Sequence, residues 1–172
     1  MKKRIKLTSI LLLFLSISAF GQKFDVEESN NTIAEFKKTD PDISKFFNSS
    51  YGYAVLYSVG KGGVGVGGAS GKGTVYKGGA PEADVRMTQF TVGLQLGGQK
   101  YAEVIFFENK DTYDRFVGSN FEFSAQVSAV ALKEGVSADA EYRDGVLVFT
   151  MAIGGLMYEA SIGGQKFKVT EF

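Results

Sequence analysis

The sequence contains no cysteine and no histidine. Without cysteine the chain forms no disulfide bond and offers no thiolate for catalysis or metal binding. A hydrolase without either residue would need a Ser-Lys pair, paired carboxylates or a metal held by carboxylates alone. The pairs that fit are Ser58 with Lys61 and Asp139 with Glu141. The residue inventory therefore argues against an enzyme and predicts neither a cofactor nor a metal site.

The first 21 residues have the three parts of a secretory leader. Four basic residues lie within residues 2–6, an apolar run covers residues 10–17, and small residues occupy Ala19 and Gly21. This succession is typical of a signal peptide that is cut before Gln22. The apolar run is shorter than the roughly 20 residues that span a bilayer, which argues against a membrane anchor. We therefore expect residues 1–21 to be a signal peptide and the mature protein to be periplasmic or secreted, with peripheral attachment to a membrane left open.

The mature chain is acidic overall. The full sequence has 19 basic and 19 acidic residues, and removal of the leader leaves 15 basic residues and a net charge of −4. A negative charge argues against binding to nucleic acid, because such binding depends on neutralising phosphates with Lys and Arg. The 44% content of hydrophobic residues is that of a globular chain, and the length fits one domain.

Residues 22–50 are predicted to form an N-terminal helical arm. The apolar positions of Asp25 to Phe47 have helical spacing, and Pro41 divides the pattern into two short helices, the second beginning near Asp40 or Pro41. Two interpretations remain open for the arm. It packs on a sheet, or it contacts a membrane through Phe36, Phe46 and Phe47.

Residues 51–172 have the period of two that is typical of β-strands with one buried face. The alternation is clear from Val85 to Leu96, from Phe121 to Ala129 and from Val136 to Arg143, and the last two segments are expected to be antiparallel strands. Glycines mark the expected turns at 97–98, 134–135, 144–145, 154–155 and 163–164. One internal helix is expected over Asn109–Val117, capped by Asn109. The predicted fold class is α+β, with a mainly antiparallel and strongly curved or barrel-like sheet, a short N-terminal helical arm and one short internal helix.

Ten of the 22 glycines lie between Gly60 and Gly79. The spacing of Gly63, Gly65 and Gly68 fits G-x-G-x-x-G, but the residues that follow have strand rather than helix character, which argues against a dinucleotide site. Between Asp42 and Glu82 the chain has no acidic residue, whereas lysines occur at positions 45, 61, 72 and 77. We weigh two roles for Lys61, Lys72 and Lys77: protection of strand edges, and binding of an anionic headgroup.

Several ordered motifs resemble the SYLF domain family. They are Gly52-Tyr53-Ala54-Val55, the segment Ser58 to Gly63, Gly71-Lys72-Gly73, Thr88-Gln89, Gly93 to Gln99, Phe121 to Ala131, Gly154 to Met157, and Ser161 to Gln165. The resemblance covers roughly residues 46–168, and it identifies residues 51–172 as a SYLF-like domain.

The resemblance implies a membrane-lipid ligand and no catalysis. Eukaryotic members of the family bind phosphoinositide-rich membranes, some bind actin filaments, and bacterial members are mostly short exported proteins. The leader separates this chain from actin and from cytosolic phosphoinositides. We therefore expect a non-enzymatic protein that binds anionic phospholipid at a membrane surface outside the cytoplasm. There are two alternatives. One is an exported structural or protein-interaction module, whose partners the sequence does not name, and the other is a hydrolase.

Overall fold

A computed structural model describes residues 18–118, 121–123, 129–154 and 163–172. The described part of the chain begins with the helix α2 (Ser18–Thr39), followed by a short 3₁₀ helix η1 (Pro41–Ile43) and the helix α3 (Ser44–Ser49). Asp40 caps η1 with its side chain, and Pro41 occupies the first turn. The predicted break at Pro41 is confirmed, whereas α2 begins at Ser18, upstream of the expected cleavage position.

Two very long strands, β1 (Gly52–Lys77) and β2 (Ala80–Phe107), form an antiparallel ribbon. Gly78 and Gly79 join them, with φ of +56° and +83°, which is the conformation a tight two-residue hairpin requires. The ribbon bends where the pairing shifts between Val64 and Val66, so each strand has two arms. We call residues 52–64 and 66–77 the first and second arms of β1, and residues 80–92 and 96–107 the first and second arms of β2.

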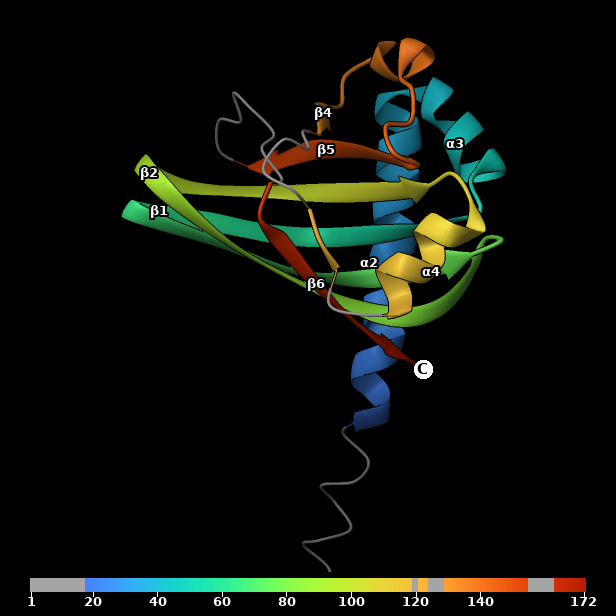
Figure 1. The fold of residues 1–172 in the computed structure, drawn as a ribbon, viewed down its shortest axis with the longest axis horizontal. Helices are drawn as coiled ribbons and strands as arrows, with labels where there is room; N and C mark the ends of the chain where they lie inside the picture. The colour runs from blue at the N-terminus through green and yellow to red at the C-terminus, as the bar shows by residue number, and fades with distance from the viewer. Residues whose placement is uncertain (1–17, 119–120, 124–128, 155–162) are drawn as a thin grey trace, which may run out of the picture.

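The two arms of β1 lie against each other. A Cβ atom on Gly52 would lie 2.7 Å from the backbone oxygen of Tyr76, and one on Gly73 would collide with the backbone of Val55. The rings of Tyr53 and Tyr76, from different arms, stack at a centroid distance of 4.9 Å. Glycine thus permits the close approach that curls the ribbon back on itself. Figure 1 shows the resulting strongly curled sheet.

The remaining elements extend the sheet and cover it. In chain order they are α4 (Lys110–Gly118), β3 (Phe121–Glu122), β4 (Val130–Ala131), η2 (Val136–Asp139), β5 (Val146–Gly154) and β6 (Gln165–Glu171). The strand order is β3-β6-β2-β5-β4, and β1 pairs with β2. The helix α4 is capped by Asn109, whose Oδ1 accepts the Thr112 N–H at 3.0 Å, so the predicted internal helix is confirmed. The predicted α+β fold with a curved, mainly antiparallel sheet is also confirmed.

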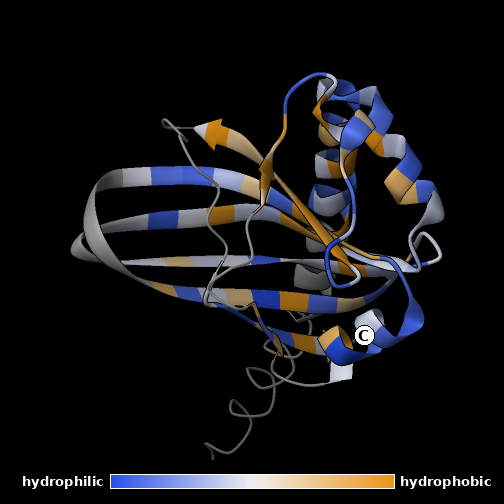
Figure 2. Cartoon of the chain, turned by 45° about the horizontal axis from the view of Figure 1, so that its top comes forward, coloured by the Kyte–Doolittle hydropathy of each residue, from blue (hydrophilic) through white to orange (hydrophobic). Residues whose placement is uncertain are grey.

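Each face of the curled sheet has its own hydrophobic core. The inner face packs against α4, with Phe116 between Phe107 and Phe167 at centroid distances of 4.6 and 5.2 Å. The outer face packs against α2 and α3, where Phe47 lies 4.8 Å from Phe106. In Figure 1, α2 runs behind the strands and α4 lies in front of them. Figure 2 shows hydrophobic and hydrophilic residues alternating along the strands, as two-faced strands require.

Two local predictions were wrong. Gly97 and Gly98 are not a turn, because both pair with glycines of β1 inside the long strand β2. The segment Val136–Arg143 is not a strand: it begins with η2, where Asp40 captures the Ser137 N–H at 2.8 Å. The strand expected over Phe121–Ala129 is described only in part: β3 is antiparallel to β6, as predicted, and residues 124–128 lie outside the described part of the chain. The next strand, β4, is parallel to β5.

The close approach of the β1 arms gives a stability prediction. The substitution Gly73→Ala forces a methyl group into the Val55 backbone, which cannot swing aside as a side chain can. We expect a loss of about 1–3 kcal/mol in the free energy of unfolding, as for other overpacked sites. Urea denaturation measures it. Gly60→Ala in the same strand is the control, because no atom lies within 4 Å of its new Cβ. Equal stability of the two variants would contradict the close approach.

Candidate functional site

Three basic side chains lie side by side on the outer face of the sheet, beyond the part that α2 covers. The strand register pairs Lys72 of β1 with Arg86 of β2, and Arg86 with Lys168 of β6. All three residues are exposed. We call these residues the basic row. Lys72 lies two residues before Thr74, whose hydroxyl accepts a hydrogen bond from Ser29 of α2 at 3.0 Å, so the basic row begins next to the helix.

A second row of polar residues runs parallel to the basic row. It consists of Ser70 on β1, Thr88 on β2 and Lys166 on β6, which are paired in the same register. The Lys166 amino group lies 3.4 Å from a carboxylate oxygen of Glu122, so part of its charge is already balanced. The hydroxyls of Ser70 and Thr88 therefore provide further hydrogen-bonding groups beside the basic row.

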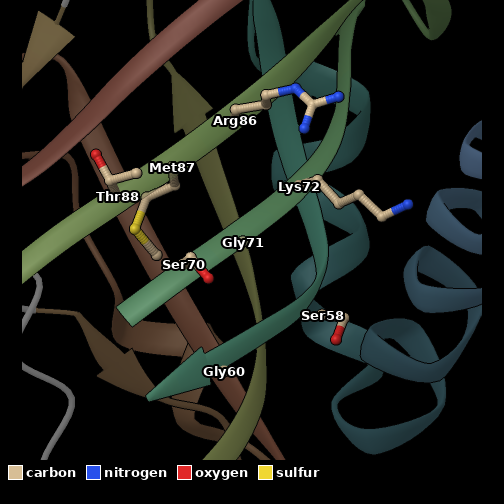
Figure 3. Close-up of a pocket in the computed structure, with 8 residues that line it drawn as sticks. All are labelled: Ser58, Gly60, Ser70, Gly71, Lys72, Arg86, Met87 and Thr88. Carbon is tan, nitrogen blue, oxygen red and sulfur yellow. The ribbon is translucent and has the colours of Figure 1, made fainter. Parts of the chain in front are cut away.

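The outer face is hollowed where β1 folds back. An open pocket of about 470 Å³ is lined by Ser58, Gly60, Ser70, Gly71, Lys72, Arg86, Met87 and Thr88. Figure 3 shows Lys72 and Arg86 extending in the same direction from neighbouring strands. The lining has two cationic groups and three hydroxyls, and none of its residues is acidic. Gly71, in the second arm of β1, lies close to Val59 in the first arm: a Cβ on Gly71 would lie 2.8 Å from the Val59 side chain. Glycine therefore lets the two arms approach each other at the pocket.

The charge pattern of this face favours anions. Like charges directly opposite each other in a sheet repel, and a bound anion relieves that repulsion. Arg supplies a planar set of donors that matches phosphate or carboxylate oxygens, and Lys adds a compact charge. Lys72 also lies over the Tyr57 ring, with 5.5 Å between the amino group and the ring centroid. The arrangement is suited to holding an oxyanion such as a phosphate.

The three lysines singled out in the sequence do not come together. Lys61 lies two residues after Val59, which is buried in the core of the inner face, so strand alternation places Lys61 on the inner face, away from the basic row. Lys77 lies at the hairpin, 3.9 Å from a carboxylate oxygen of Glu82 and 5.9 Å from the ring centroid of Tyr113. Lys72 alone of the three lines the pocket. Binding of a headgroup by these lysines remains a prediction, and the geometry separates them.

The three phenylalanines that the sequence suggested for membrane contact are buried in the structure. Phe36, Phe46 and Phe47 have exposed fractions of 0%, 5% and 8%. Phe46 and Phe47 pack on Phe106 of the sheet, with centroid distances of 5.6 and 4.8 Å. The arm therefore packs on the sheet, and these rings are not available to a membrane in this structure.

Sequence reasoning did not single out Arg86 and Lys168. The signal was present in the alternation of the strands, because Arg86 and Thr88 alternate with the buried Val85 and Met87. Which strands are neighbours, and in which register, was not readable from that alternation. Only the pairing of β1, β2 and β6 assembles the basic row.

A separate polar cluster lies inside the curl of the sheet. Glu103 is fully buried, and its Oε2 accepts a hydrogen bond from the Gln165 side-chain amide at 3.0 Å. The same amide lies 3.4 Å from the Tyr101 hydroxyl. No described residue donates to Glu103 Oε1 or Gln165 Oε1. Burial raises the pKa of Glu103 to about 7, and the hydrogen bond from Gln165 opposes this rise.

The pairs considered for catalysis are not assembled. Ser58 lines the pocket, whereas Lys61 lies on the inner face of the sheet, two residues after the buried Val59. Asp139 ends η2, and Glu141 lies in the exposed segment after it, so the two do not share a strand face. Over the described ranges no three acidic side chains gather as a metal site. Among the helices described, none has both the length and the apolarity to cross a bilayer.

The structure defines an α+β domain with a curled, mainly antiparallel sheet whose outer face carries the basic row beside an open pocket. Residues 88–171 match the Ysc84 family, described as "Las17-binding protein actin regulator". Residues 88–171 therefore belong to this family, which is the SYLF family that the motifs of the sequence indicated. The chain is also 32% identical over 138 residues to "Beta cell expansion factor A" of Aeromonas veronii, an alignment that covers 74% of this chain. The chain spans about half of that relative, 49% of its length.

Proposed function

We propose that this protein binds anionic phospholipid headgroups at a membrane surface and acts without catalysing a reaction. The observation that carries the proposal is the basic row of Lys72, Arg86 and Lys168, which borders an open pocket without an acidic lining residue. Membership of the SYLF family supports a lipid ligand, as its motifs implied. A phospholipid headgroup and free inorganic phosphate both present phosphate oxygens to the basic row. Free phosphate is therefore the competing ligand.

The expected affinity is modest. Each basic residue near an anionic surface contributes about 1 kcal/mol, so the basic row alone contributes on the order of 3 kcal/mol. These side chains are exposed, and physiological salt screens exposed charges over about 8 Å. Binding should therefore weaken as salt is added.

The family description names an actin regulator, and the Aeromonas relative is named for expansion of beta cells. We favour the lipid over actin because the leader sequence predicts export away from actin. The alternative is a protein-interaction module without lipid specificity. The vesicle-binding experiments distinguish it from a lipid-binding protein.

Charge reversal of the basic row tests the proposal. The triple variant Lys72→Glu, Arg86→Glu, Lys168→Glu should lose about 100-fold or more in affinity for anionic vesicles, since roughly 3 kcal/mol of attraction is removed. The control reverses Lys38, Lys110 and Lys133, which are exposed elsewhere and change the net charge equally. Co-sedimentation at two salt concentrations measures binding, and circular dichroism checks folding.

Each outcome of this experiment is informative. A folded basic-row variant that pellets as well as the parent overturns the assigned surface. Inorganic phosphate is added as a competitor to the parent protein bound to vesicles. If release needs a phosphate concentration far above that of the vesicle phosphate, the ligand is a membrane headgroup and not free phosphate. Binding of phosphate with no binding to anionic vesicles overturns the lipid assignment. A double variant of Lys61 and Lys77 should keep most of the binding, because those residues lie away from the pocket.

We also propose that the mature protein begins at Gln22 and acts outside the cytoplasm. The basic residues 2–6, the apolar run 10–17, and Ala19 with Gly21 motivate this proposal. Intact-mass analysis of the exported protein should give the mass of residues 22–172. A mass that includes Met1 to Gly21 would show that the leader is retained.

A further inference from the structure

One aromatic side chain stands out of the outer face of the sheet. Phe90 on β2 is 82% exposed, the highest value among the large hydrophobic residues described. Phe172 and Ile153 are 52% and 49% exposed. A phenylalanine normally contributes its large apolar surface to a core, so such a high exposure on a regular strand needs a cause.

The residues directly beside Phe90 on both flanking strands are glycines. In β1 the residue paired with Phe90 is Gly68. On the β6 side, a Cβ on Gly164 would lie 3.9 Å from the Phe90 backbone oxygen, so Gly164 is the adjacent residue there. Cross-strand neighbours usually cover an aromatic ring in a sheet, and glycine has no side chain with which to do so. The ring is therefore left uncovered by the local sequence of three strands.

Phe90 shares its face with the basic row. Arg86, Thr88 and Phe90 alternate with the buried Val85, Met87 and Gln89, so all three project outward. At about 3.4 Å per residue, Phe90 lies roughly 14 Å along the strand from Arg86. Thr88, between them, is paired with Lys166. The outer face thus presents cationic groups, then a hydroxyl and a lysine, and then a bare aromatic ring.

We propose that Phe90 is the residue that enters the membrane interface when the basic row docks on an anionic leaflet. This inference rests on the proposed function and adds an orientation to it: the outer face of the first arm of β2 lies on the membrane. The basic row contacts the headgroups, and the ring passes between them toward the acyl chains. Apolar groups of peripheral proteins reach about 5–10 Å into this boundary.

Phe90 supplies what the charges alone lack. Three exposed cations give weak and salt-sensitive attachment, and two kinds of signal are needed for stable anchoring. Burial of a phenylalanine side chain contributes as much as two or three such charges. The electrostatic contact and the aromatic ring therefore act together, and loss of either weakens attachment.

The chain contains no tryptophan, so Phe90→Trp gives a protein with a single indole fluorophore. On anionic vesicles we expect its emission to shift to shorter wavelength and to be quenched by lipids brominated in the acyl chain. Neutral vesicles and high salt should prevent both changes. The control is Ile153→Trp, an exposed position on β5, which pairs with the second arm of β2 and not with the first. Its emission should stay unchanged although the protein pellets with the vesicles. In parallel, Phe90→Ser should lower vesicle affinity by about 10- to 100-fold, while Ile153→Ser should leave it unchanged.

The outcomes separate this inference from the proposed function. If Phe90→Trp pellets with anionic vesicles but its emission is unchanged, the insertion is wrong and the lipid-binding function stands. If neither the parent nor this variant pellets, both fail. A shift of the Ile153→Trp emission instead would overturn the proposed orientation. A shift of Phe90→Trp that needs no vesicles and grows with protein concentration would assign the ring to contact with a second copy of the chain.

Discussion

Replacing Glu103 with glutamine should raise the free energy of unfolding by about 3 kcal/mol at pH 8 and change it little at pH 4.5. Burial raises the pKa of Glu103 from 4.5 to about 7 in the folded protein. Between these two values the folded state binds more protons than the unfolded state, so stability falls as the pH rises. A difference of about 2.5 pKa units corresponds to roughly 3 kcal/mol, fully lost above pH 7.

Glutamine at position 103 removes this loss because it has no charge to bury. Its side-chain oxygen still accepts the Gln165 amide, which now lies 3.0 Å from Glu103 Oε2. Urea denaturation of the two proteins from pH 4.5 to pH 8 measures the difference, and Glu108→Gln, at an exposed position, is the control. A stability gain that is equal at all pH values would show that ionisation of Glu103 does not limit stability.

Replacing Phe46 with alanine should lower the free energy of unfolding by about 3–5 kcal/mol, as expected for removal of a buried ring. Phe46 is 5% exposed and lies within 6 Å, between centroids, of Phe106, Tyr142 and Phe149. The substitution leaves a cavity between α3 and the sheet. Thermal and urea denaturation measure the loss.

Phe90→Ala is the matched control for Phe46→Ala. The same change of residue at an 82% exposed position should alter stability by less than about 0.5 kcal/mol. Vesicle binding should respond in the opposite way, with a loss for Phe90→Ala and none for folded Phe46→Ala. A stable Phe46→Ala variant that no longer binds vesicles would restore the N-terminal arm as the membrane contact.

Local interactions explain what could be predicted from the sequence. The break at Pro41 depends on the proline ring, and the start of α4 depends on a hydrogen bond between Asn109 and Thr112, three residues apart. The period of two in β2 follows from the strand itself, whatever its partner. For the same reason the α+β fold class and the helical arm were predictable. The order of the SYLF motifs is likewise a property of the sequence.

Tertiary contacts decided the features that were predicted wrongly or missed. Val136–Asp139 is helical because Asp40, 97 residues away, captures the Ser137 N–H. Phe46 and Phe90 are both apolar residues in periodic segments, yet α3 packs one against the sheet, and glycines on both neighbouring strands leave the other bare. Burial depends on which element covers a side chain, and no local pattern contains that information.

The sequence by itself determined the chemical groups available to this protein: no cysteine or histidine, a lysine-containing segment free of acidic residues, and strands with one polar face. Only the tertiary structure decided which of those groups meet. The fold-back of β1 and the register of three strands bring Lys72, Arg86 and Lys168 into one row and turn Lys61 and Lys77 away from it. The physical reason is that strand pairing joins residues far apart in the chain, and a shift of one residue in register moves every side chain to the opposite face.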